Sequence, residues 1–174
     1  MSDSTWPSWS FRSTADAAYG ETVLFDADDP AGVAHALTSE NSYLTLATVG
    51  SDDGPWASPV WFAARGLELF VWASKPGARH SRHIAENPRV SLVIFDSRQS
   101  PGAGSALYAS AAAGLVDDAG FDEALQIYNA RSRERGLSEW DAVDLRAPAR
   151  HRLYTAVADE VFVLDDHDER VRVR

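Results

Sequence analysis

The sequence predicts a mainly β fold with helices, in which six antiparallel strands close, or nearly close, into a barrel. Three observations indicate this fold. Short runs rich in β-branched and aromatic residues follow one another with turn residues between them. Segments with helical periodicity lie before, between and after these runs. Finally, six strands suit a closed sheet, which leaves few unpaired edges.

The predicted strands are joined mostly by short connections. They cover residues 42–50, 54–64, 67–74, 89–96 and 106–116, with one or two closing strands within 152–173. The first three follow each other so closely that we expect an antiparallel meander. The runs "PVWFAA" and "LFVWA" are almost continuously apolar, so we expect both to be covered on both faces.

Four segments have the spacing of helices. They cover residues 28–41, 78–86, 121–136 and 137–145. In the first segment, Asp29 suits the N-cap and Pro30 suits the first helical position. In the last segment, Ser138 is the expected cap, with Asp141 three residues further on.

Composition limits the classes of protein that this chain can represent. The 174 residues include no cysteine, which excludes disulfides and thiolate metal sites. A net charge of −10 argues against broad nucleic-acid binding. There is no apolar run of membrane-spanning or signal-peptide length, so we expect a cytoplasmic protein without a membrane segment. We expect a flexible arm over residues 1–20 and a single domain over 21–174.

One stretch reverses the acidic character of the chain. Residues 74–92, "SKPGARHSRHIAENPRVSL", contain the only lysine, three arginines and a single acid. A predicted strand, a Pro-Gly turn and a predicted helix start follow one another here. This order has the geometry of an anion site, because the N–H groups at a helix start point outward and the helix dipole favours negative charge there.

Three side chains at this turn suit a phosphate monoester. Ser74 ends the strand and offers a hydroxyl, while Arg79 and His80 lie in the first turn of the helix. Arginine makes forked contacts with phosphate oxygens. From local chemistry, the sequence therefore offers a phosphate site at the start of this helix.

A solvated helix face is the alternative interpretation of the same stretch. We expect Arg82, His83 and Glu86 to face solvent, with Ile84 pointing inward. A metal held by His80 and His83 is disfavoured, because two histidines without a third ligand make a poor site. No metal site is therefore expected.

The order of these motifs resembles the FMN-binding split-barrel proteins related to pyridoxamine 5′-phosphate oxidase. The matching stretches are "LATVGSDDGPWASPVWFA" and "SKPGARHSRHIAENPRVSLVIF", and the resemblance covers residues 43–96 well. The stretch "HRLYTAVADEVFVLD" also resembles the closing strand of that family. The resemblance implies that residues 21–174 form a Greek-key split β-barrel that binds FMN. It also implies a homodimer with each flavin at the subunit interface.

The resemblance also implies which residues contact the cofactor. A serine and a basic pair hold the phosphate, and the second strand lies against the ring system with its backbone groups at the pyrimidine edge. The cofactor-binding residues expected in this chain are Ser58, Pro59, Val60, Trp61, Ser74, Lys75, Arg79 and His80. Many relatives have lysine where this chain has His80.

By the same resemblance, we expect a flavin-dependent oxidoreductase that acts on an unknown small molecule, with hydride chemistry at the flavin. The closing strand has no clear counterpart of the oxidase's second phosphate clamp, so we expect a relative rather than that oxidase. The alternatives are a deazaflavin-dependent reductase and a non-catalytic module that binds flavin or haem. For haem, His151 and His167 are the candidate axial ligands. No catalytic acid or base is assigned.

Overall fold

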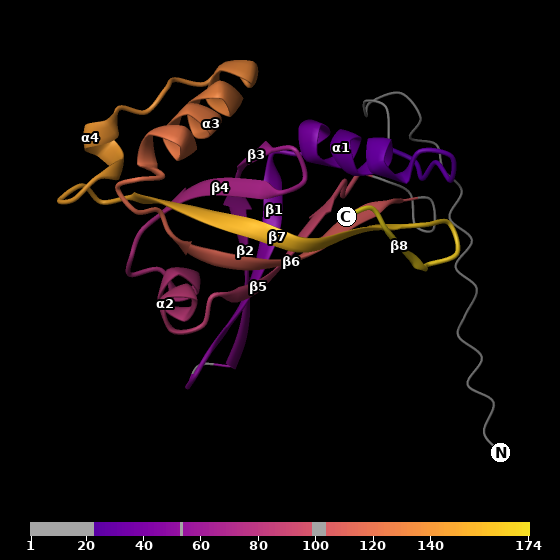
Figure 1. Ribbon diagram of the computed structural model, residues 1–174, viewed down its shortest axis with the longest axis horizontal. Coiled ribbons are helices and arrows are strands. Elements are labelled where there is room, and N and C mark those ends of the chain that lie inside the picture. The colour runs from indigo at the N-terminus through magenta and orange to yellow at the C-terminus, as the bar shows by residue number, and fades with distance from the viewer. Residues whose placement is uncertain (1–22, 53, 99–103) are drawn as a thin grey trace.

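The computed structural model describes residues 23–52, 54–98 and 104–174; the arm predicted over residues 1–20 lies outside them. The described chain forms a curled sheet with helices around it (Figure 1). In chain order the elements are α1 (Pro30–Glu40), β1 (Tyr43–Gly50), β2 (Gly54–Trp61), β3 (Ala63–Arg65), β4 (Leu69–Ser74), α2 (Arg79–Glu86), β5 (Arg89–Phe95), β6 (Ala106–Leu115), α3 (Phe121–Glu134), α4 (Ala142–Leu145), β7 (Arg152–Leu164) and β8 (Arg170–Arg172). Among these described helices, none is long and apolar enough to cross a membrane.

The strands belong to one antiparallel sheet that curls back on itself. Its hydrogen-bonded order is β2-β1-β5-β6-β7-β4-β3, and β8 pairs with β7. The two strands at the ends of this order are consecutive in the sequence and are separated only by Phe62, which is fully buried. The sheet must therefore bend until its two ends meet at Phe62. This arrangement confirms the predicted mainly β fold and split barrel.

The strand count differs from the six predicted. The segment predicted as one strand over residues 54–64 divides at Phe62, where the chain changes partner from β1 to β4. The predicted meander is wrong for this reason. The first strands form two hairpins, β1–β2 and β3–β4, at opposite ends of the described sheet. The closing segment divides into the long strand β7 and the short strand β8.

Two apolar clusters explain why β4 lacks polar alternation. Phe70 and Trp72 point into the barrel and join the main core. Val71, between them, belongs to a second cluster that includes Phe121 and Tyr128 of α3. All three β4 residues are fully buried. The prediction that "LFVWA" is covered on both faces is therefore confirmed for its three central residues, and α3 supplies the outer cover.

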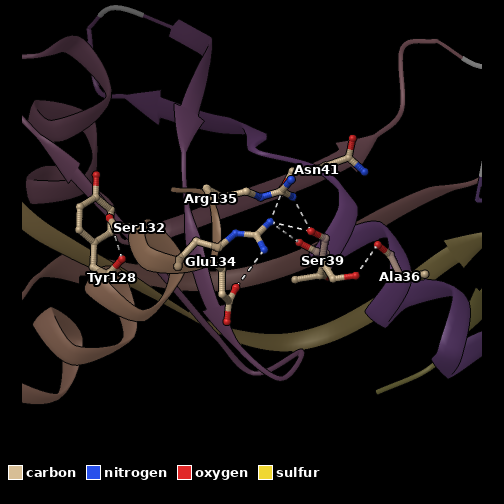
Figure 2. Close-up of polar contacts among 9 residues, drawn as sticks. Ala36, Ser39, Asn41, Tyr128, Ser132, Glu134 and Arg135 are labelled. Atoms are coloured by element: carbon tan, nitrogen blue, oxygen red, sulfur yellow. Dashed lines mark hydrogen bonds and ion pairs between the residues drawn. The ribbon is translucent and has the colours of Figure 1, made fainter. Parts of the chain in front are cut away.

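Two arginines at the C-terminal end of α3, one in its last turn and one at its C-cap, hold the end of α1 (Figure 2). The Nη2 atom of Arg131 donates to three carbonyl oxygens at 2.8–3.3 Å, those of Thr38, Ser39 and Asn41. Arg135 also donates to the Ser39 carbonyl, at 2.5 Å. The last turn of α1 contains no basic residue of its own, and the helix dipole makes this end negative. The two guanidinium groups therefore act as the positive cap of α1.

Of the two predicted helix caps, the one at α1 is confirmed and the one at α4 is wrong. Asp29 caps α1 as predicted, because its Oδ1 atom accepts a hydrogen bond from the Gly32 N–H at 2.8 Å. The cap predicted at Ser138 is wrong. The N-cap of α4 is Asp141, whose own N–H donates to the carboxylate of Asp144 at 3.3 Å. The helix starts one turn later than its periodicity suggests, because the preceding turn is held by contacts with α3 rather than by helical hydrogen bonds.

Candidate functional site

The candidate site starts where β4 ends. Ser74 is the last residue of β4 and is buried, and the next residue, Lys75, is exposed. The Ala78 N–H donates to the Lys75 carbonyl at 3.0 Å, which closes the turn before α2 starts at Arg79. No side chain caps the start of α2, and its first turn contains no acidic residue. The positive end of the α2 dipole is thus left for another negative group.

His80 connects three elements of the site. Its Nε2 atom lies 2.8 Å from Ser74 Oγ, and its Nδ1 atom lies 3.2 Å from Ser58 Oγ on β2. A neutral imidazole donates from one nitrogen and accepts at the other, so it fits between two hydroxyl groups. Burial, and then the neighbouring His83, lower the pKa of His80 below its ordinary value. His80 is therefore neutral near pH 7.

Arg79, the other member of the predicted basic pair, lies over the ring of Trp56. Its guanidinium carbon is 4.4 Å from the ring centroid, which is within the range of a cation–π interaction. Trp56 and Ser58 are two residues apart on β2, so both side chains are on the same face of the strand. The first turn of α2 therefore meets β2 at two points, Arg79 on Trp56 and His80 on Ser58. Trp56 was not among the predicted residues, although the alternation along β2 could have identified it.

The far side of α2 lies against the end of β1. The prediction that His83 faces solvent is wrong, because its side chain is only 2% exposed and its Nδ1 atom lies 3.0 Å from Thr48 Oγ1. A Cβ atom at Gly50 would lie 2.6 Å from the His83 ring, so glycine is required at that position. Arg82 and Glu86 are exposed, as predicted. The helix is thus held on two sides, which fixes the direction of its first turn.

The predicted ring-binding segment of β2 divides its side chains between two faces. Ser58 and Val60 point inward and are buried, whereas Pro59 is exposed on the other face. Trp61 is half-buried on that outer face and packs edge-on against Tyr128, with ring centroids 4.9 Å apart. The structure therefore brings Ser58 together with Ser74, Arg79 and His80. The other residues of the segment can share a ligand with this group only through the β2 backbone.

Metal and haem ligands are less well placed. In residues 23–52, 54–98 and 104–174, no group of three or more histidine, cysteine or acidic side chains could hold a metal ion. The ring of His151 contacts the edge of Trp140, with centroids 6.0 Å apart. The side chain of His167 is 80% exposed and lies 3.7 Å from Asp166.

The buried histidine makes stability depend on pH. Because the pKa of His80 is lower in the folded chain than in the unfolded chain, its contribution is fully present above the unfolded value, about 6.5. That contribution is lost as the pH falls through this value toward the folded pKa. We expect His80→Gln to reduce the fall in free energy of unfolding between about pH 7 and pH 5. Urea unfolding at several pH values measures this slope.

The matched control for this prediction is His35→Gln, which changes an exposed histidine of α1. We expect the His35 variant to keep the pH slope of the unaltered protein. If both variants had the same slope as the unaltered protein, His80 would not be the group that is charged on acid unfolding.

Fold and site together define a split-barrel protein with a candidate anion site at the turn between β4 and α2. A family model described as pyridoxamine 5′-phosphate oxidase matches residues 33–164. The chain therefore belongs to the pyridoxamine 5′-phosphate oxidase family. No curated protein matches its sequence.

Solved structures share the fold. A haem-binding protein from Mycobacterium smegmatis has a TM-score of 0.65 at 16% identity, covering 86% of this chain and 59% of that one. HutZ, the haem storage protein of Vibrio cholerae, has a TM-score of 0.57 at 23% identity, covering 75% of this chain and 91% of that one. An FAD-binding protein from Mesorhizobium loti has a TM-score of 0.57 at 17% identity, covering 80% of this chain and 94% of that one. The fold thus accommodates both flavin and haem among its known members.

Proposed function

We propose that this chain is a cytoplasmic flavin-dependent oxidoreductase that binds FMN through the first turn of α2 and acts on a small molecule. The observation that carries the proposal is the arrangement of Arg79 and His80, set against β2 and against Ser74 at the end of β4. Family membership and the FAD-binding structural neighbour support a flavin as the ligand.

The residues at this turn fit a phosphate group. Arg79 supplies a permanent charge, Ser74 supplies a hydroxyl, and the uncapped start of α2 supplies backbone N–H groups. His80 is neutral before binding, and a phosphate dianion would raise its pKa. When bound, FMN would supply the hydride chemistry. The chain's own part is to hold the phosphate and to orient the ring along the β2 backbone.

Titration of the apoprotein with FMN, followed by flavin fluorescence, tests this proposal. We expect a saturable change. No saturable change up to high micromolar FMN would overturn the proposal. If only a deazaflavin, or only haem, gave a saturable change, that ligand would be the cofactor instead of FMN. For FMN-loaded protein, bleaching of the flavin absorbance by a nicotinamide reductant distinguishes an oxidoreductase from a non-catalytic flavin-binding module.

We also propose a homodimer with each flavin at the interface. Whereas α3 packs on the outer side of β4, two aromatic side chains on the outer face of β1 and β5 are largely exposed, Tyr43 at 60% and Phe95 at 50%. The register pairs Tyr43 with Trp61, so this face continues onto the strand expected to carry the flavin ring. A second copy of the chain would therefore cover the aromatic face and the ring together.

Sedimentation at micromolar concentration tests the dimer. We expect a mass of about twice 19.0 kDa. The double variant Tyr43→Glu, Phe95→Glu should shift the protein toward the monomer, because it places charges in the proposed contact. A monomer that holds its flavin fully bound would contradict the shared site.

A further inference from the structure

A second group of cationic side chains lies next to the proposed phosphate site. The antiparallel register pairs Ser74 at the end of β4 with Arg152 at the start of β7. Continuing this register by one position places the exposed Lys75 opposite His151. Burial, then Lys75 and then Arg150 lower the pKa of His151. Two cationic side chains therefore lie beside one imidazole.

Neither of these two cations is paired with an acidic side chain of the described residues. Neither Lys75 nor Arg150 forms an ion pair with any residue of the described ranges. The chain as a whole carries a net charge of −10, and other exposed arginines are paired, for example Arg89 with Asp159. A local excess of positive charge on an acidic protein attracts an anion.

An aromatic ring completes this group. Trp140, in the connection between α3 and α4, is half-buried and contacts the His151 ring. Its backbone is fixed by Asn129 through two hydrogen bonds of 2.9 Å, one donated and one accepted by the asparagine side chain. Its ring also contacts Tyr128, with centroids 6.5 Å apart. The indole is therefore held in place at the surface beside the cations.

We propose that Lys75, Arg150, His151 and Trp140 form a site for the second phosphate and the base of flavin adenine dinucleotide. The cations suit a phosphate, and the indole and imidazole rings suit a stacked planar base. The location agrees with this role. Ser74 lies within hydrogen-bond distance of His80 in the proposed phosphate site, and the next residue, Lys75, belongs to the second group of cations. This inference rests on the proposed flavin site and extends it from a mononucleotide to a nucleoside diphosphate.

Parallel titrations of the apoprotein with FMN, FAD and ADP test the inference. We expect FAD to bind about tenfold more tightly than FMN, because it gains a charge-assisted contact. Arg150→Gln should lower the affinities for FAD and ADP by about tenfold and change that for FMN by less than about twofold. Trp140→Leu should also lower the affinities for FAD and ADP, because the base would lose its stacking partner. Arg133→Gln, which changes an exposed arginine paired with Glu139, is the matched control and should alter none of the three affinities.

The outcomes separate this inference from the proposed function. If FMN binds but FAD binds no more tightly, or if Arg150→Gln weakens FMN and FAD equally, the second site is overturned and the FMN site stands. If FMN does not bind but ADP binds and is lost in Arg150→Gln, the proposed function fails and the nucleoside diphosphate site stands. Failure of all three ligands to bind overturns both. Circular dichroism of Trp140→Leu verifies that the variant is folded.

Discussion

Replacing Arg79 with alanine should weaken FMN binding by about ten- to a hundredfold. Its guanidinium is the permanent charge in the first turn of α2, and the Trp56 ring holds it at 4.4 Å before any phosphate arrives. A hydrogen bond to a charged group contributes about 1.5–3 kcal/mol, which corresponds to this range of affinities. Arg79→Lys should recover only part of the loss, because an ammonium cannot make the planar fork. Flavin fluorescence measures the affinities.

Arg82 provides the matched control. It lies three residues further along α2, is exposed, and donates a hydrogen bond to the Gly77 carbonyl at 2.8 Å. We expect Arg82→Ala to change FMN affinity little. Riboflavin, which lacks the phosphate, should bind Arg79→Ala about as weakly as it binds the unaltered protein. Equal and small effects of the two arginine changes would mean that α2 presents only a solvated face.

The largest loss of stability is expected for Arg131→Leu. The Arg131 side chain is only 11% exposed, and its three hydrogen bonds cap the negative end of α1. Because the carbonyl groups of Thr38 and Asn41 would lose their charged donor and that of Ser39 would keep only Arg135, we expect the free energy of unfolding to fall by about 2–4 kcal/mol. Urea unfolding at pH 7 measures this change.

The same helix offers a control for Arg131. Arg133 pairs with Glu139 at 2.6 Å, but both side chains are about half exposed, at 57% and 49%. Exposed ion pairs contribute little, so Arg133→Leu should lower the free energy of unfolding by less than about 1 kcal/mol. If the two variants lost similar, small amounts of stability, α1 would be held by its apolar face rather than by the arginine cap.

Most elements of this fold could be predicted because their signals are local. Asp29 with Pro30 marks the start of α1, and the β-branched runs mark the strands. Partner exchange at Phe62 could not be predicted, because nothing in the run "PVWFAA" distinguishes pairing with β1 from pairing with β4. The outer cover of β4 was unpredictable for the same reason. The hydrophobic pattern showed that Val71 needs a partner, but not that α3 supplies it.

The candidate site was predicted where the chain itself brings residues together. Ser74 and His80 are six residues apart, and a strand–turn–helix order places them near each other. Trp56 was missed, because its contact with Arg79 depends on how α2 lies on β2. The expectation that His83 faces solvent follows from placing Ile84 inward on a basic helix, whereas the burial of His83 depends on Gly50, thirty-three positions earlier, leaving room for the ring. The burial and contacts of such residues depend on long-range packing, which local sequence patterns do not show.

The change of partner at Phe62 also limits how the length of this chain can vary. Alternate strand residues face opposite sides, so one added residue beside Phe62 would turn either Ser58 or Ala63 to the wrong face. The connection from α3 to α4, by contrast, lies outside the barrel and can change length without altering any register. Homologous chains should therefore differ by insertions and deletions around residues 136–138, between Arg135 and the segment that holds Trp140, while the segment from β2 to β3 keeps a constant number of residues.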